Sequence, residues 1–174
     1  MASKASIAGH PIHPMLVSIP IGLFVFSLVA DLAVRAGFGD AWSTVAVYCM
    51  GGGIVGALLA APFGLIDLLS MSDERVKKIG IAHMVINLVI VALYVCNFLL
   101  RWPSGTGEGT PFLLSVLAVL LLLASGWLGG HMVFVHGAAV SAPGERPIAE
   151  RRKARIPVRN DRRTMPPGSP LGQY

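Results

Sequence analysis

The sequence predicts an all-α integral membrane protein in which four transmembrane helices form an antiparallel four-helix bundle. Its 174 residues are 54% hydrophobic and 13% charged, with a mean hydropathy of +0.68. Soluble domains carry about 25% charged residues, so the composition argues against a water-soluble fold. Four long stretches with few or no charges are each near or above the roughly 20 residues that a helix needs to cross a bilayer. Their continuous hydrophobicity favours helices over the alternating strands of a barrel.

The transmembrane domain is predicted to comprise residues 1–140, with spans at about 14–36, 41–69, 79–100 and 111–136. The first span has no strongly basic segment before it and no evident cleavage site after it, so we expect a retained helix and not a signal peptide. Short connections favour an up-down-up-down order. Pro20 and Pro62 should kink their helices, because proline removes a backbone donor. The four spans show no convincing internal repeat, which makes a transporter the less favoured class.

Basic residues are divided unequally between the two ends of such a bundle. The N-terminus, the loop between the second and third spans and the tail would share one side, and they hold 12 of the 14 Lys and Arg residues. Only Arg35 and Arg101 fall on the other side. Because cytoplasmic segments are enriched in Lys and Arg, both termini are expected in the cytoplasm. The Pro/Arg-rich tail at 141–174 is interpreted as a topology determinant that contacts anionic lipids, and not as a nucleic-acid-binding face.

Five histidines and one aspartate are predicted to gather at the cytoplasmic end of the bundle: His10, His13, His83, His131, His136 and Asp67. They come from all four spans. An ionisable side chain inside a membrane segment indicates a functional site by default. The histidines are therefore candidate ligands of a metal or cofactor, and Asp67 is a candidate carboxylate that fixes a ligand imidazole.

The spacing of the histidines predicts some of their geometry. His10 and His13 lie in a Gly-His-Pro-Ile-His-Pro motif, and a polyproline-like conformation would point both to the same side, roughly 9 Å apart along the axis. His131 and His136 should differ by roughly 140° around a regular helix, so one ion should not bind both. This restriction disappears if the helix ends before His136, and Gly137 could supply such an end.

Two other patterns favour structural roles. Asp31 and Arg35 lie one helical turn apart near the outer interface, which predicts an ion pair within one helix, with Arg35 extending to the headgroups. Small residues recur at GxxxG spacing in the second and fourth spans, at Gly52 and Gly56 and at Gly126 and Gly130. Such spacing favours close packing within the bundle and leaves a homodimer or the close approach of a flat cofactor open.

Several motifs occur in an order that resembles a widespread bacterial family of predicted four-helix membrane proteins of unknown function, marked by an N-terminal GHPxHP motif. The matching segments are residues 9–17, 19–22, 64–67, 82–87, 126–130 and 136–137. The resemblance covers about residues 7–140 and implies a location in the bacterial inner membrane. His131 departs from it, since relatives often carry an acidic residue there. Some members are fused to Rieske-type or c-type cytochrome domains, which implies redox work in the membrane.

Together these observations favour a redox-associated membrane protein that binds haem b. The axial ligands would be His83 with His136, or His83 with His10 or His13, because haem iron takes axial histidines. A quinone or a redox protein would exchange the electrons. One alternative is a non-haem Zn, Fe or Cu site formed by the same histidines with Asp67. The other is a non-enzymatic assembly subunit, in which the histidines only form hydrogen bonds. The sequence identifies no reaction.

Overall fold

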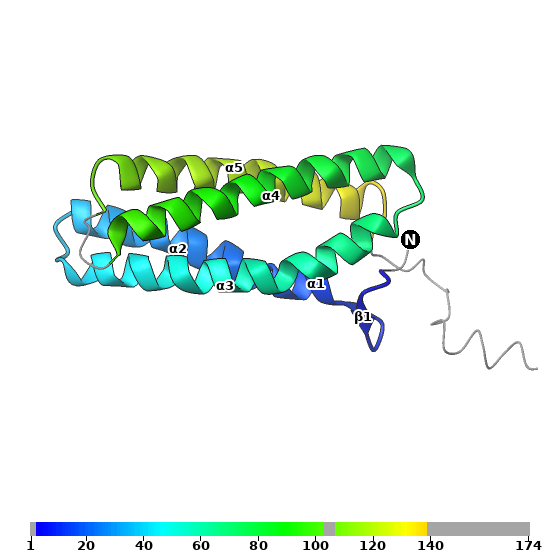
Figure 1. The fold of residues 1–174 in the computed structure, drawn as a ribbon, viewed down its shortest axis with the longest axis horizontal. Coiled ribbons are helices and arrows are strands. Elements are labelled where there is room, and N and C mark those ends of the chain that lie inside the picture. The colour runs from blue at the N-terminus through cyan, green and yellow to red at the C-terminus, as the bar shows by residue number, and fades with distance from the viewer. Residues whose placement is uncertain (1–2, 103–106, 139–174) are drawn as a thin grey trace, which may run out of the picture. The chain divides into compact units, whose positions relative to one another are not determined.

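The structure is a computed structural model of the chain, and it describes residues 3–102 and 107–138. Over these residues the elements are β1 (Ser6–Ile7), β2 (His10–Pro11), α1 (Ile12–Leu16), α2 (Ser18–Arg35), α3 (Ala41–Leu69), α4 (Glu74–Arg101) and α5 (Thr110–Phe134). The predicted fold class is confirmed, because the long apolar helices pack against one another as an all-α bundle (Figure 1). The predicted basic tail at 141–174 lies outside the described residues.

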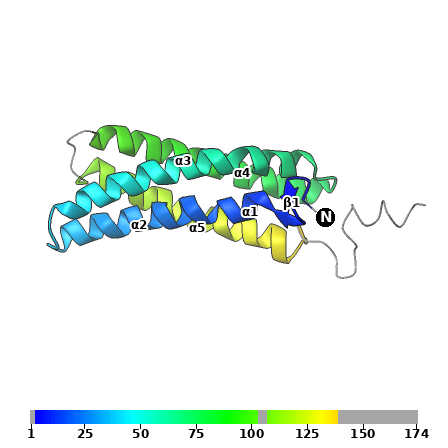
Figure 2. The same cartoon turned by 90° about the horizontal axis from the view of Figure 1, so that it is seen from below.

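The bundle is made of two helical hairpins. The first hairpin is α1, α2 and α3, and the second is α4 and α5. The most extensive contacts lie within each hairpin, and α3 with α4 and α2 with α5 join the two (Figures 1 and 2). Going around the bundle, the order is therefore α2, α3, α4, α5, so that α2 and α4 are diagonal and run in the same direction. The buried core includes Phe24, Met50, Ile90 and Tyr94.

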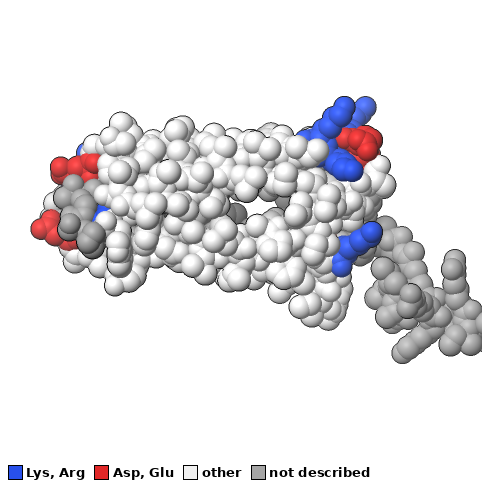
Figure 3. Space-filling model, viewed as in Figure 1, with Lys and Arg blue, Asp and Glu red and all other residues white. Residues whose placement is uncertain are grey.

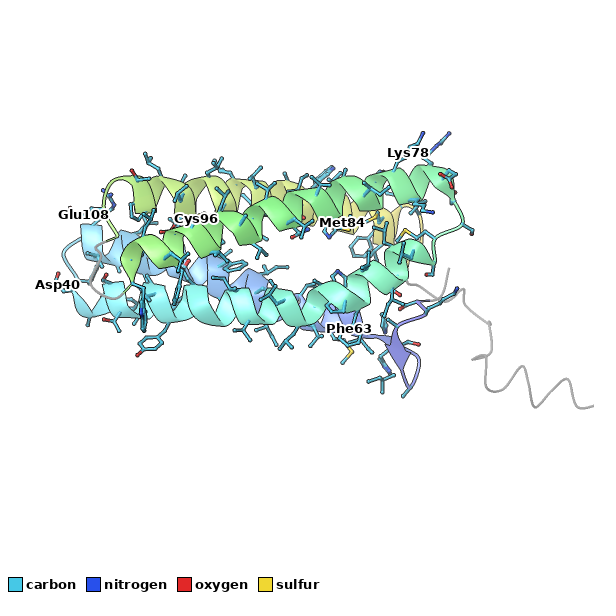
Figure 4. All side chains as sticks on the ribbon, viewed as in Figure 1. Asp40, Phe63, Lys78, Met84, Cys96 and Glu108 are labelled. Carbon is cyan, nitrogen blue, oxygen red and sulfur yellow. The ribbon has the colours of Figure 1, made fainter. Side chains whose placement is uncertain are left out.

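The surface of the described residues has the character of a membrane protein. Over these residues, four helical stretches are long and apolar enough to span a bilayer, Ile12–Arg35, Ala41–Leu69, Glu74–Arg101 and Thr110–Phe134. Charged side chains gather at the two ends and leave an uncharged band between them (Figure 3). We call the end that carries Lys4, Arg75, Lys77 and Lys78 the basic end. Lys78 marks it in Figure 4, and Asp40 and Glu108 mark the opposite end.

The N-terminal segment differs from the polyproline-like conformation predicted for it. β1 and β2 form an antiparallel pair in which Ile7 faces His10. Ala8 and Gly9 connect them with φ values of 50° and 83°, the left-handed conformations of a tight hairpin turn. The prediction was wrong because the extended conformation ends at Pro11 and α1 begins at Ile12. As a result His10 lies on an exposed strand, whereas His13 lies half-buried in α1.

Two prolines interrupt the regularity of the first hairpin. Pro20 cannot donate to the carbonyl of Leu16, and α1 is separated from α2 at Val17, the next residue. Pro62 lies inside α3, and the last part of α3 turns toward α4 in Figure 1. Proline therefore shapes this hairpin near the basic end, where the histidines lie.

The helix ends at the basic end are capped. Asp73 precedes α4, and its Oδ1 accepts hydrogen bonds from the backbone N–H groups of Arg75 at 2.8 Å and Val76 at 3.2 Å. These hydrogen bonds hold the pKa of Asp73 below its ordinary value. α5 ends at Phe134, and Gly137 follows with a φ of 64°, as is typical after a helix C-terminus.

Candidate cofactor site

His13 is held against α3 by a backbone carbonyl and a glycine. Its Nδ1 lies 3.0 Å from the carbonyl oxygen of Ala60. A carbonyl oxygen can only accept, so Nδ1 carries the proton and Nε2 carries the lone pair. The ring fits because residue 64 is glycine: a Cβ there would lie 2.7 Å from Cε1 of His13. His13 thus presents Nε2 as a ligand atom with its ring orientation fixed.

His83 is held against α5 in the same manner. Its Nδ1 lies 2.9 Å from the carbonyl oxygen of Ser125, which again places the proton on Nδ1 and the lone pair on Nε2. A Cβ on Gly129 would lie 3.3 Å from Cε1 of His83. Nδ2 of Asn87 reaches Nε2 of His83 at 3.2 Å, and it also donates to the carbonyl of His83 at 2.8 Å and to Oγ of Ser125 at 2.6 Å. If Nδ2 of Asn87 lost its contact with Nε2 of His83, its hydrogen bonds to the carbonyl of His83 and to Oγ of Ser125 would remain.

His13 and His83 belong to different hairpins, His13 to α1 and His83 to α4. The surface is hollowed between α3 and α4 (Figure 3), and Figure 4, in the same view, places Met84, the neighbour of His83, at that level. Each hairpin therefore contributes one imidazole that a backbone carbonyl of the same hairpin holds in place.

The other three histidines have other neighbours, whereas all five were expected to gather at the cytoplasmic end. His131 and His136 pair with each other, with ring centroids 5.0 Å apart and the rings nearly perpendicular. Their contact is allowed because α5 ends before His136, so the 140° separation of a regular helix does not apply. His136 interacts electrostatically with Asp73 at the start of α4. His10 is exposed, and its Nδ1 lies 3.1 Å from the carbonyl of Ala8.

Asp67 anchors the N-terminal segment to α3. Its Oδ1 accepts hydrogen bonds from Oγ of Ser3 at 2.7 Å and from the N–H of Ala5 at 3.2 Å. Within the described part of the chain these contacts replace the expected contact with a ligand histidine. Asp67 therefore helps to fix the segment that leads into α1, and so acts on His13 only through the backbone.

The described residues hold no larger cluster of metal-binding side chains. Over residues 3–102 and 107–138, no three side chains of His, Cys, Asp or Glu gather closely enough to hold one metal ion. Structural and catalytic zinc sites take three or four protein ligands. Haem iron needs only its axial ligands from the protein, because the porphyrin supplies the rest.

A buried ion pair that the sequence reasoning missed joins the hairpins at the opposite end. Asp31 contacts Arg101 in a two-pronged ion pair, Oδ1 with Nη1 at 2.5 Å and Oδ2 with Nη2 at 2.9 Å. Their residues are only 2% and 1% exposed. The predicted pair of Asp31 with Arg35 was wrong, because Arg35 instead lies over the ring of Phe112, 3.9 Å from its centroid. The ion pair could have been found from the sequence, because Asp31 and Arg101 lie at the same depth in two spans that run in the same direction.

Two polar side chains and a glycine complete this ion pair. Nε of Arg101 donates to Oδ1 of Asn97 at 2.9 Å, and Oγ of Ser115 donates to Oδ2 of Asp31 at 3.2 Å. A Cβ on Gly107 would lie 2.8 Å from both Nη1 of Arg101 and Oδ1 of Asp31. Among the described residues, every buried side-chain N or O atom has a hydrogen-bond partner. The cluster therefore acts as a satisfied structural connection between α2, α4 and α5.

The glycine pairs have different surroundings. In α3, a Cβ on Gly52 would lie 3.1 Å from Cδ1 of Leu23, and a Cβ on Gly56 would lie 3.2 Å from Pro20. These glycines allow α2 to pack closely, in agreement with the bundle-packing interpretation of the second span. Gly126 in α5 has no such neighbour within 4 Å among the described atoms.

A family model described as "Predicted membrane protein (DUF2231)" matches residues 9–142 of the chain. No curated protein and no solved structure matches it.

Proposed function

The chain belongs to the DUF2231 family of predicted membrane proteins, and we propose that it is a membrane haem b protein in which His13 and His83 are the axial ligands. The observation that carries the proposal is a pair of imidazoles, one in each hairpin, each with Nδ1 bonded to a backbone carbonyl. Ligand histidines in metal sites commonly have their second nitrogen fixed in this way. The proposal keeps one of the ligand pairs expected from the sequence, His83 with His13.

The residues around the pair have separate roles in this proposal. The carbonyls of Ala60 and Ser125 hold the protons on Nδ1 and leave Nε2 of both rings unprotonated. Gly64 and Gly129 make room for the rings. The basic side chains at the same end offer partners for the propionates of a haem. A haem with two axial histidines supplies one-electron exchange, and we propose a membrane quinone or a redox protein as its electron partner.

The proposed orientation places the basic end in the cytoplasm. On the opposite end, Arg101 is neutralised by Asp31 within the bundle, so Arg35 is the exposed arginine there among the described residues. The excess of Lys and Arg at the basic end supports an inner-membrane protein with cytoplasmic termini. Reporter fusions to either terminus should be active only with a cytoplasmic reporter, and activity of a periplasmic reporter at either terminus would contradict the orientation.

The test is the absorption spectrum of the full chain purified in detergent, together with its haem and metal content. We expect a Soret band and about one haem per chain. His13→Ala and His83→Ala should each remove the haem. His10→Ala is the matched control, because His10 is exposed and its ring contacts the carbonyl of Ala8 in its own turn, and it should retain the haem.

The remaining outcomes contradict the proposal. Full haem occupancy in His83→Ala would show that other ligands hold it. A colourless protein with stoichiometric Zn, Fe or Cu by elemental analysis would support the non-haem alternative. A protein with neither haem nor metal would support an assembly subunit in which these histidines only form hydrogen bonds.

A further inference from the structure

Two pairs of residues on α2 and α4 meet across the bundle at one constant separation of 70 residues. They are Phe24 with Tyr94, and Asp31 with Arg101. Helices that pack in parallel have a constant separation for geometrical reasons alone. His13 in α1 and His83 in α4 are also 70 residues apart in the sequence, and both are histidine, which packing alone does not explain.

The buried positions repeat at the same separation. In α2 they include Pro20, Phe24, Ser27 and Asp31, and in α4 they include Ile90, Tyr94, Asn97 and Arg101. The second helices of the hairpins correspond at a separation of 65, with Met50, Gly53 and Ala60 buried in α3 and Ser115, Ala118 and Ser125 buried in α5. α3 and α5 lie diagonally in the bundle, so their contact with each other does not impose this match.

The strongest sign is that each hairpin makes the same local contact. His13 bonds the carbonyl of residue 60, and the glycine that accommodates its ring is residue 64. His83 bonds the carbonyl of residue 125, and the corresponding glycine is residue 129. In both cases the glycine follows the carbonyl by one helical turn. These contacts lie inside the hairpins, so the packing of one hairpin on the other does not produce them.

We infer that residues 12–69 and 82–134 are two copies of one helical unit, related by a two-fold axis parallel to the helices, and that His13 and His83 are equivalent ligands of one site on this axis. The repeat stands on the contacts above, and the equivalence of the ligands rests on the proposed function. Parallel repeats with sites at their interface are known in membrane proteins. The repeat inferred here differs from the expectation drawn from the sequence, in which few identities, such as Leu23 with Leu93, would mark it.

The test exchanges residues across the axis in the full chain and measures the midpoint of thermal unfolding, Tm, in detergent. Asp31→Arg and Arg101→Asp each bury two like charges and should lower Tm by about 10 °C. The double exchange should recover at least half of this loss, because positions related by the axis have equivalent surroundings. A double variant no more stable than the worse single variant would overturn the repeat.

A second pair of substitutions separates a true axis from a simple reversal of charge. Nε of Arg101 is held by Asn97, four residues before it, and the equivalent of Asn97 in the first unit is Ser27. Ser27→Asn with Asn97→Ser should therefore raise Tm in the charge-exchanged chain and lower Tm in the wild-type chain. A change in Tm of the same sign in both chains would contradict the two-fold axis.

Milder variants keep the test decisive if the charged ones do not fold. Phe24→Tyr with Tyr94→Phe moves one hydroxyl across the axis and should unfold within a few degrees of the wild type, above Tyr94→Phe alone. A Tm at or below that of Tyr94→Phe would count against the repeat. Equal haem loss in His13→Ala and His83→Ala supports equivalent ligands, and unequal loss contradicts their equivalence. A wild type without haem refutes the proposed function and leaves the exchange results to decide the repeat.

Discussion

The hydroxyl of Tyr94 donates a hydrogen bond to the backbone carbonyl of Phe24 at 2.9 Å, and the two rings stack with their centroids 3.9 Å apart. This contact joins the hairpins at the middle of the bundle, between the histidine pair and the ion pair. Oγ of Ser27 donates to the same carbonyl at 2.7 Å, so the carbonyl keeps a partner when the hydroxyl is removed.

We therefore expect Tyr94→Phe to be mild. It removes one buried hydrogen bond without leaving the carbonyl unpaired, which is worth about 1 kcal/mol and a few degrees in Tm. Tyr94→Leu also removes the stacked ring and should be clearly worse. Thermal unfolding in detergent measures both variants, and equal losses would show that the ring stack contributes little.

The ion pair of Asp31 and Arg101 should show strong coupling. Asp31→Leu or Arg101→Met alone leaves one charge buried without its partner, which costs about 3–5 kcal/mol. The double variant removes both charges and should be more stable than either single variant. A double-mutant cycle from chemical or thermal unfolding measures this coupling. Additive losses would mean that the two side chains do not depend on each other.

Glycine 64 should be essential for the position of His13. In Gly64→Ala the new Cβ would lie 2.7 Å from the imidazole, so the ring must leave its place on α3. We expect loss of haem, measured as haem per chain. Gly126→Ala is the matched control, since the same change there meets no described atom within 4 Å. It should keep the haem and gain up to about 1 kcal/mol, because alanine favours helix. Equal haem contents in Gly64→Ala and Gly126→Ala would show that His13 is not a ligand of the haem.

The cap at Asp73 should make stability depend on pH. Its pKa is lowered in the folded chain by the N–H groups of Val76 and Arg75. The stabilisation is therefore fully present above the ordinary aspartate pKa of about 3.9 and is lost as the pH falls through the lowered folded value. The difference in Tm between wild type and Asp73→Ala should be constant near neutral pH and should shrink in acid. If this difference in Tm persists at low pH, the loss of stability in Asp73→Ala comes from helix propensity and not from the charge of Asp73.

Much of the fold could be predicted from the sequence, because hydrophobicity and helix length are local properties. The bounds predicted for the second span agree with α3 at Ala41–Leu69. The partner of Asp31 could not be predicted so easily. Both Arg35 and Arg101 lie within reach at its depth, and the choice depends on which helices are diagonal in the bundle and how they are rotated.

The candidate site was predictable in part. Its chemistry was expected, since His83 lies inside an apolar span and His13 lies at the start of another. The place of His13 depends on where α1 begins and on its contact with Ala60 in α3, which no hydrophobic pattern marks. The contact of His131 with His136 depends on where α5 ends. Such choices are made by turns and tertiary packing, which act over distances that sequence periodicity does not report.

The opposite charges of Asp31 and Arg101 have a consequence for how the halves of the molecule recognise each other. If either hairpin paired with another copy of itself, the same position would bring two carboxylates or two guanidinium groups together out of water, which is strongly unfavourable. The pairing of unlike halves satisfies both groups. This one difference therefore favours assembly of the first half with the second half of its own chain, and it disfavours mispaired products while the spans come together in the membrane.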